Sequence, residues 1–259
     1  MTIVDMDAHP PFKGNQISYT GIMTADGFFD RLSRVGIGVA CGLPLLPDGW
    51  QGSAEEAVVW MSDASLKLGR EYPSRYIPVV AVHPSCPALS CRQIERGKQA
   101  GVRLAGELSG EWLADDMRAS LTTIMTCAAD HEMAVSARLK SVEEAVQWAE
   151  RYPLNQLLLC FVCNIMPVDV VKLLSTYPHL HMILSAPSMA WNYFLHEMIG
   201  RCPVERLLFG TRFPHINVAS RKASIEWELR DQPESVKDAV FGGNALRLAG
   251  GGLAGESEG

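Results

Sequence analysis

The sequence predicts an α/β fold, a (β/α)8 TIM barrel in which eight parallel strands alternate with helices. Short apolar runs recur along the chain, and they are too short and too uniformly apolar to be half-exposed hairpin strands. A longer segment with apolar residues at helical spacing follows each run. The 259 residues suit one such barrel, and right-handed crossovers of this number close into one. An open doubly wound sheet remains the alternative topology.

The first half of the chain supplies four of the strands. Each is an apolar run that ends at glycine, proline or polar residues, where a buried strand meets a loop. We expect these strands at Ile3–Met6, Ile37–Cys41, Tyr76–Val82 and Val102–Leu108. We expect the helices between them at Asp26–Arg34, Ser53–Tyr72 and Ser90–Ala100. Asp26 is the expected cap of the first helix, and the Ser-Ala-Glu-Glu sequence at Ser53 is typical of a capping box.

The second half repeats this alternation. We expect its strands at Ala134–Leu139, Leu157–Phe161, Met182–Leu184 and Leu207–Phe209. We expect its helices at Asp116–His131, Ser141–Tyr152, Pro167–Tyr177, Met189–Arg201, Ser220–Leu229 and Pro233–Phe241. Ser141 begins a second capping box, and Pro167 suits the first position of a helix. We expect one domain over residues 1–249 and a flexible glycine-rich, acidic tail over 250–259.

Composition excludes several classes of partner. The net charge is −6 and no basic stripe stands out, which argues against binding to nucleic acid or to an acidic membrane. No apolar run is long enough to span a membrane, and no signal segment is seen, so we expect a cytoplasmic protein. The seven cysteines are expected to be reduced. The expected partner is a small anionic molecule, and a homo-oligomer is compatible with the sequence.

Polar residues gather where the predicted strands end. Asp7 and His9 follow the first strand, Glu107 ends the fourth, Arg138 ends the fifth, and Arg212 follows the eighth. Ligands bind at the C-terminal ends of barrel strands, so these side chains are expected to share one mouth. Asp7 and His9 are two residues apart on an extended segment and therefore leave it on the same side.

Three of these residues are candidates for catalysis. Histidine titrates near neutral pH, so His9 is the expected acid or base, and Asp7 is expected to orient it. Glu107 is the third candidate, because a carboxylate at a strand end serves either the site or a neighbouring arginine. A structural hydrogen-bonded pair is the alternative interpretation of Asp7 and His9.

The arginines have two interpretations. Guanidinium groups in a barrel mouth need anionic partners, either internal carboxylates in a closed network or a bound ligand. In the second case Arg138 and Arg212 would bind a carboxylate or phosphate group. We take Arg138 and Arg212 as substrate-binding candidates, together with His83 at the end of the third strand, for which a role in its own loop is the alternative.

Several stretches carry a family resemblance. Ile3–His9 reads IVDMDAH, Arg206–Pro214 reads RLLFGTRFP, and Phe241–Leu248 reads FGGNALRL. With the turn Ala81–Pro84, they resemble the amidohydrolase-related (amidohydrolase 2) branch of the amidohydrolase superfamily. The resemblance covers most of the chain and implies the barrel fold and a metal-dependent hydrolase ancestry.

The resemblance also implies a metal site, and here the chain departs from the pattern. Family members use a His-x-His or Glu-x-His pair on the first strand, histidines at strands five and six, and an aspartate after strand eight. Here the first-strand pair is Asp7 and His9. Strand five ends at Arg138, and strand six ends at Cys160–Asn164, so neither end has a histidine. Arg212 stands in place of the aspartate after strand eight. We therefore expect a degenerate site without a metal cofactor, with a divalent metal such as zinc as the disfavoured alternative.

Two functions follow from these observations. The first is a hydrolase or decarboxylase-like enzyme that acts on a small carboxylated or cyclic substrate, by hydrolysis, lactone opening or decarboxylation, without the usual metal centre. The second is a catalytically inactive descendant that binds a small anion or serves as an assembly subunit. Loop residues set specificity in barrels, so the sequence names no substrate.

Overall fold

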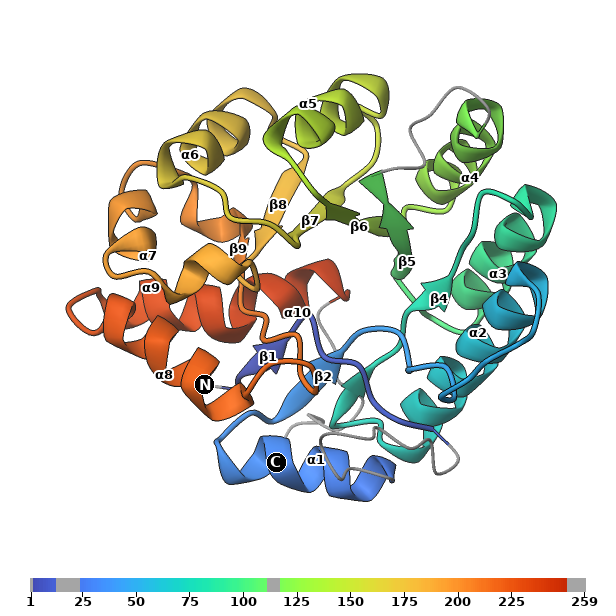
Figure 1. Ribbon diagram of the computed structural model, residues 1–259, viewed down its shortest axis with the longest axis horizontal. Helices are drawn as coiled ribbons and strands as arrows, with labels where there is room; N and C mark the ends of the chain where they lie inside the picture. The colour runs from blue at the N-terminus through green and yellow to red at the C-terminus, as the bar shows by residue number, and fades with distance from the viewer. Residues whose placement is uncertain (1, 13–23, 111–116, 251–259) are drawn as a thin grey trace.

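The protein forms a ring of parallel strands surrounded by helices (Figure 1). The structure is a computed structural model, and it describes residues 2–12, 24–110 and 117–250. Strand order follows chain order in two sheets, β1-β2-β3 and β4-β5-β6-β7-β8-β9. Backbone N–H groups of Met6 and His9 donate to the carbonyls of Phe209 and Phe213, which joins the β1 segment to the segment after β9. The predicted TIM barrel is confirmed.

The strands are short and buried, as the apolar runs indicate. They are β1 Val4–Asp5, β2 Val39–Cys41, β3 Tyr76–Ile77, β4 Val80–Ala81, β5 Leu104–Ser109, β6 Ala134–Leu139, β7 Leu157–Phe161, β8 Leu180–Ile183 and β9 Leu207–Leu208. The predicted strand Tyr76–Val82 is divided into β3 and β4, because Pro78 has no N–H to donate to the ladder. This division separates the two sheets. β8 begins earlier than predicted, at Leu180.

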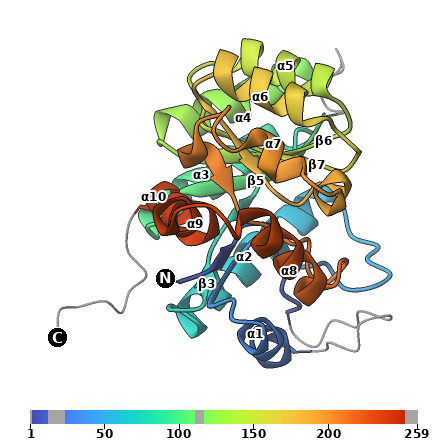
Figure 2. The same ribbon diagram turned by 90° about the vertical axis from the view of Figure 1, so that its left-hand side faces the viewer.

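Helices pack around the outside of the ring (Figure 2). They are α1 Ala25–Arg34, α2 Ala54–Glu71, α3 Pro87–Gln99, α4 Arg118–Asp130, α5 Val142–Arg151, α6 Pro167–Thr176, α7 Phe194–Met198, α8 Val218–Leu229, α9 Glu234–Asp238 and α10 Asn244–Leu248. Shorter turns are η2 Pro187–Ala190 and η3 Val204–Arg206, and Ala239–Gly243 (η4) is π-helical. No described helix is long and apolar enough to cross a membrane. The tail after residue 250 lies outside the described residues.

Two predicted helices are broken in the structure. The segment Met189–Arg201 forms η2 and α7 instead of one helix, because Tyr193 between them has a φ of 64°, a left-handed conformation that a right-handed helix cannot contain. The segment Pro233–Phe241 forms α9 and then the π-helical turn that leads into α10. Neither break has a glycine or a proline at its centre to indicate it.

Capping follows the sequence at two helices and departs from it at a third. Ser53 accepts from the backbone of Glu56, whose side chain accepts in return from the Ser53 backbone, so the predicted capping box of α2 is confirmed. Ser141 caps α5. The cap of α1 is Thr24, not Asp26, which lies in the first turn and accepts from the Tyr72 hydroxyl.

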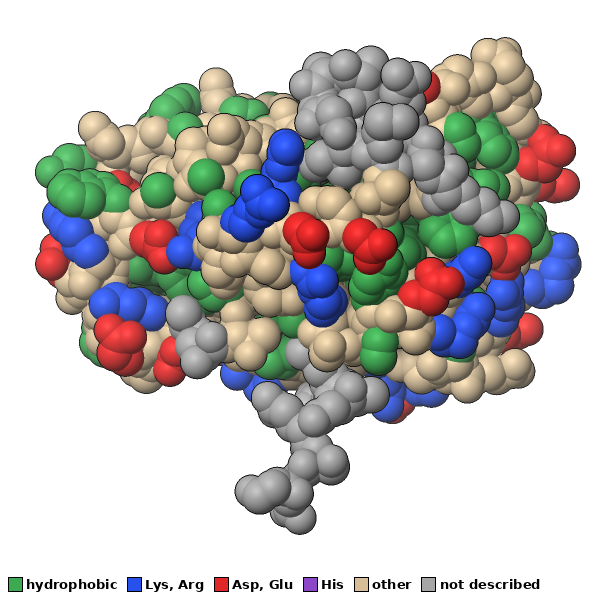
Figure 3. All heavy atoms as spheres, turned by 90° about the horizontal axis from the view of Figure 1, so that it is seen from below, with side chains coloured by type: hydrophobic (Ala, Val, Ile, Leu, Met, Phe, Trp, Pro, Cys, Tyr) green, Lys and Arg blue, Asp and Glu red, His purple; other side chains and the backbone are tan. Residues whose placement is uncertain are grey.

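The core has two parts that together fix the barrel mouth. Strand residues that point outward pack against the helices around fully buried rings such as Trp148 and Phe28. Residues that point inward, among them Leu104, Leu158 and Leu208, fill the barrel interior, and α10, which crosses the ring in Figure 1, packs against them. On the visible part of the face in Figure 3, acidic and basic side chains are interspersed. The packed interior forms the floor beneath the site.

Candidate active site

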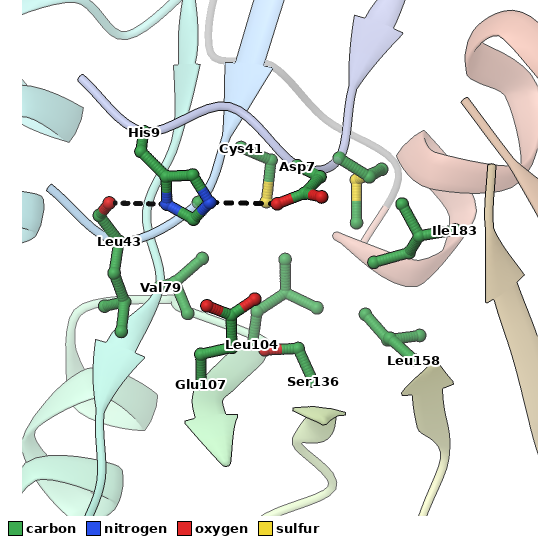
Figure 4. A pocket seen from close by; sticks show the side chains of 12 residues that line it. Asp7, His9, Cys41, Leu43, Val79, Leu104, Glu107, Ser136, Leu158 and Ile183 are labelled. Carbon is green, nitrogen blue, oxygen red and sulfur yellow. Dashed lines mark hydrogen bonds and ion pairs between the residues drawn. The ribbon is translucent and has the colours of Figure 1, made fainter. Parts of the chain in front are cut away.

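Asp7 and His9 form a buried pair on the segment after β1. Asp7 is 2% exposed and His9 is 7% exposed. The Nε2 of His9 donates to Asp7 Oδ1 at 2.9 Å, and its Nδ1 donates to the Leu43 carbonyl at 3.0 Å (Figure 4). Because both acceptors lack a proton, the ring that makes both bonds is the protonated imidazolium. The pair therefore holds a proton at a defined position.

Glu107 on β5 and Arg138 on β6 complete a charged cluster with this pair. Arg138 Nη2 donates to Glu107 Oε1 at 2.6 Å and lies 3.4 Å from Asp7 Oδ1. The Glu107 carboxylate points toward Asp7 and His9 (Figure 4). Arg138 thus already has two internal carboxylate partners, as the closed-network interpretation expects.

The charges in the cluster stabilise one another. Burial opposes the charged form of Asp7, but the hydrogen bond from His9 and the charge of Arg138 hold its pKa below the ordinary value. Burial also opposes the charge of His9, and the bond to Asp7 with the charges of Asp7 and Glu107 outweighs it and raises the pKa of His9. Burial opposes the charge of Arg138, but Glu107 and Asp7 raise its pKa. The cluster therefore stabilises the charged forms of Asp7, His9 and Arg138.

Cys160 and Ser185 support Asp7 from the side opposite His9. The Cys160 thiol donates to Asp7 Oδ2 at 3.2 Å and lies 3.2 Å from the Ser185 hydroxyl. Burial raises the pKa of Cys160 well above the ordinary value, so the thiol remains protonated. Nothing in the sequence indicated a role for Ser185, and Cys160 was not selected as a site residue. Cys160 is the register partner of Arg138 on the neighbouring strand.

Asp5 and Thr211 connect the first strand to the loop that follows the last. The Thr211 backbone donates to Asp5 Oδ1 at 2.9 Å, and its hydroxyl donates to the other carboxylate oxygen. Burial raises the pKa of Asp5 to about 6. This link fixes Thr211. The next residue, Arg212, has a left-handed backbone with a φ of 60°. Sequence reasoning placed Asp5 on the strand and gave it no role.

The cluster opens onto a cavity of about 410 Å³. Its polar lining consists of His9, Glu107, Arg138, Arg212 and His215, and its apolar lining consists of Leu43, Pro44, Leu45, Leu46 and Met61. Beneath Asp7 and Glu107 lies a hollow of about 20 Å³, room for about one water molecule. Four of the five predicted mouth residues line this cavity, and the fifth, Asp7, is bonded to two of them, His9 and Arg138.

His83 is placed elsewhere. Its Nδ1 lies 2.7 Å from the Ser85 hydroxyl in the loop before α3, and the ring is not among the residues that line the cavity. Substrate binding by His83 stays a prediction, and its position gives that prediction no support.

The donor set in the mouth suits a hard divalent cation. Asp7, Glu107 and Cys160 each place one ligand atom within 4.8 Å of the others. Carboxylate oxygens are preferred by manganese and magnesium, whereas a protonated thiol is a poor ligand. The guanidinium of Arg138 bonds to both carboxylates, so a bound cation requires this side chain to move toward the open cavity that it lines.

A profile of one protein family matches most of the chain. The family is described as Amidohydrolase, and the match covers residues 45–250. A comparison with curated proteins gives no match. The matched range includes Glu107, Arg138 and Arg212 and excludes Asp7 and His9.

Solved structures share the fold at low sequence identity. The 5-carboxyvanillate decarboxylase of Sphingomonas paucimobilis is similar with a TM-score of 0.73 and 13% identity, over 95% of this chain and 98% of that one. The 5-carboxyvanillate decarboxylase of Novosphingobium aromaticivorans, complexed with manganese and 4-hydroxy-3-methoxy-5-nitrobenzoic acid, gives 0.70 and 14%, over 96% of each chain. The dihydroxybenzoic acid decarboxylase of Polaromonas sp. JS666, with manganese and 2-nitroresorcinol, gives 0.67 and 13%, over 96% of each chain.

These structures correct the expectation about the cofactor. From the missing histidines and from Arg212, we expected no metal cofactor. Similar barrels contain manganese, which contradicts that expectation. Histidines are absent from the family positions, but Asp7 and Glu107 together present oxygen ligands at one place.

Proposed function

Because this chain belongs to the amidohydrolase family, we propose that it is an enzyme that decarboxylates a small carboxylated ring compound with the help of a divalent metal ion such as manganese. The observation that carries the proposal is the cluster of Asp7, His9 and Glu107, of which His9 and Glu107 line the cavity that Arg212 also lines. The similar barrels described above decarboxylate such compounds.

Asp7 and Glu107 are the residues that would hold the metal ion, since both offer carboxylate oxygens to the same point. When bound, a divalent ion supplies Lewis-acid polarisation of the substrate oxygens. Cys160 and Ser185 keep Asp7 in place by hydrogen bonds. Arg138 would leave the carboxylates and turn toward the cavity, where its charge can meet the substrate.

His9 is the proposed proton donor. Its bond to the Leu43 carbonyl fixes the ring, and its Nε2 proton is held by Asp7 on a ring that lines the cavity. Decarboxylation replaces a carboxylate by a proton on the same carbon, so a positioned proton donor is the group that the reaction needs. Arg212 would hold a substrate carboxylate at the other wall, and the apolar residues from Leu43 to Leu46 would contact the ring.

Hydrolysis of a small cyclic or amide substrate is the second candidate, because the family is described by that chemistry. The inactive descendant has no support from the cavity, where acid, base and cation groups share one opening. Residues 1–249 as one domain, a cytoplasmic location and a homo-oligomer remain proposals.

The test of the proposed function is a substrate panel. The protein is dialysed against a chelator, reloaded with Mn²⁺, and supplied with carboxylated phenols, lactones and amides, while released CO₂ and hydrolysis products are measured. We expect CO₂ release from a carboxylated phenol that falls by roughly a hundredfold or more in His9→Asn and in Asp7→Asn. Glu143→Gln on the outer surface of α5 is the control and keeps the parent rate. No turnover with any substrate, or full activity in Asp7→Asn, would contradict the proposal.

A further inference from the structure

Two partly exposed cysteines lie on neighbouring helices, Cys91 near the start of α3 and Cys127 in the last turn of α4. The two helices pack side by side on the outside of the ring (Figure 1). Both cysteines are free thiols, whereas four others, among them Cys160, are buried. Cys91 and Cys127 are therefore more open to reagents in solution than most thiols of this chain.

Each of these two thiols contacts the backbone from which the other side chain projects. The Cys127 Sγ lies 3.9 Å from the carbonyl oxygen of Cys91 itself. The Cys91 Sγ lies 3.9 Å from the carbonyl oxygen of Thr123, one helical turn before Cys127 on α4. Because a carbonyl oxygen is about 2.4 Å from the Cα of its own residue, the Cys127 sulfur lies within about 6.3 Å of the Cys91 Cα. The two side chains therefore point toward each other across the helix interface.

The acidity of Cys127 agrees with this geometry. Burial, and after it the neighbouring Cys91 thiol, raises the pKa of Cys127 to about 12, and the charges of Glu95 and Asp130 act in the same direction. The thiolate is the reactive form of cysteine, so Cys127 is not the thiol that attacks first. Once the Cys91 sulfur is part of a disulfide it can no longer carry a charge, and one cause of the raised pKa of Cys127 is removed.

We propose that Cys91 and Cys127 form a reversible disulfide that joins α3 to α4 by exchange with a small disulfide such as oxidised glutathione. The Cys91 thiolate attacks one sulfur of the small disulfide, forms a mixed disulfide and releases one small thiolate. Cys127 then gives its proton to that thiolate and attacks the Cys91 sulfur, which releases the second small thiolate and closes the bridge. Two cysteine thiols lose two electrons in total, and the small disulfide is reduced to two thiols.

The bridge constrains a segment that carries a residue of the site. It joins positions 36 apart in the sequence, and the enclosed segment contains β5 with Glu107. In the chain-entropy account, a cross-link stabilises the fold because it restricts the unfolded chain, and the effect grows with the enclosed length. Oxidation is therefore expected to raise the melting temperature. The bridge is independent of the proposed function, because no group of the barrel mouth takes part in it.

The test equilibrates the full chain in buffers with different ratios of reduced to oxidised glutathione. Acid and an alkylating agent stop the exchange, and mass spectrometry of peptides locates each disulfide. We expect a peptide pair joined through Cys91 and Cys127 that is lost again in reducing buffer. Cys127→Ser is expected to stop at the mixed disulfide of glutathione on Cys91. Cys163→Ser, which removes a partly exposed thiol in the loop after β7, is the control and keeps the bridge.

A second readout measures how well the bridge fits the folded protein. We expect the oxidised parent to melt several degrees above the reduced parent, and Cys91→Ser to melt at the same temperature in both buffers. Mixed disulfides without the bridge in the parent would overturn the proposal, and so would joined peptides that pair Cys91 or Cys127 equally with other cysteines. A lower melting temperature of the oxidised parent would also overturn it, because the helices would then have to separate to form the bond.

Discussion

At the scale of single residues, the site depends on hydrogen bonds that fix each charged group. His9 is held by a backbone carbonyl and by Asp7, and Asp7 is held in turn by Cys160 and Arg138. Alternation along the first strand predicted that Asp7 and His9 share a side. The contribution of Cys160 could not be read from the sequence, because its partner Asp7 lies 153 positions away.

Thr211 supports the buried carboxylate of Asp5, and a substitution at Thr211 tests how much its hydroxyl stabilises the fold. In Thr211→Val the side chain keeps its shape but loses the hydroxyl that donates to Asp5 and accepts from the Phe213 backbone at 3.1 Å. A buried carboxylate then lacks a donor, so we expect the free energy of unfolding to fall by about 1–3 kcal/mol. Chemical denaturation measures the change. Thr122→Val on α4, where the hydroxyl bonds only to the exposed helix backbone, is the control and is expected to be near neutral.

At the scale of elements, apolar runs predicted the strands because their burial on both faces leaves a plain signal. The predicted ends of strands and helices were less accurate where a single residue interrupts the element. Pro78 divides the third predicted strand, and its effect can be seen in advance from its missing N–H. The break at Tyr193 could not be predicted, because a left-handed tyrosine is selected by its tertiary surroundings and has no local sequence signal.

The capping box of α2 is the element feature that the sequence indicates most directly. Ser53→Ala removes the acceptor for the Glu56 backbone and frees the Glu56 side chain. We expect a loss of about 1 kcal/mol in the free energy of unfolding. Ser53→Thr keeps a capping hydroxyl and is expected to restore most of the stability. A loss equal to that of alanine in Ser53→Thr would show that the bond does not stabilise the helix.

At the scale of the whole molecule, barrel closure creates what the sequence could not show. Eight strand–helix units predicted the fold, and the ends of the strands predicted that Asp7, His9, Glu107, Arg138 and Arg212 meet. The link between Asp5 and Thr211 joins positions 206 residues apart, and only the closed ring reveals it. The metal expectation failed because it relied on residue types at family positions and not on the combined donor set.

The stability of the barrel depends on pH through His181 of β8, at the end opposite the site. Burial, with the charges of Arg206 and Arg247, lowers the pKa of His181 to about 4. The unfolded chain therefore takes up this proton first as pH falls from about 6.5, and the stabilisation present above that pH is lost toward pH 4. Between pH 7 and pH 5, we expect the free energy of unfolding of the parent to fall by about 1–2 kcal/mol more than that of His181→Gln.

Urea denaturation of both proteins across that pH range measures the difference. His196→Gln, at an exposed position of α7, is the control and is expected to follow the parent. Parallel pH profiles for the parent and His181→Gln would show that His181 is protonated equally in the folded and unfolded chains.

The most direct test of the account is Mn²⁺ binding followed by the electron paramagnetic resonance signal of the free ion. The account predicts that the parent removes about one Mn²⁺ per chain from solution, and that Asp7→Asn and Glu107→Gln each weaken binding by roughly tenfold or more. Arg138→Met is expected to bind more tightly than the parent, because its guanidinium bonds to the same carboxylates. A free-ion signal unchanged by the parent protein, or binding unaltered in Asp7→Asn and Glu107→Gln, would contradict the account.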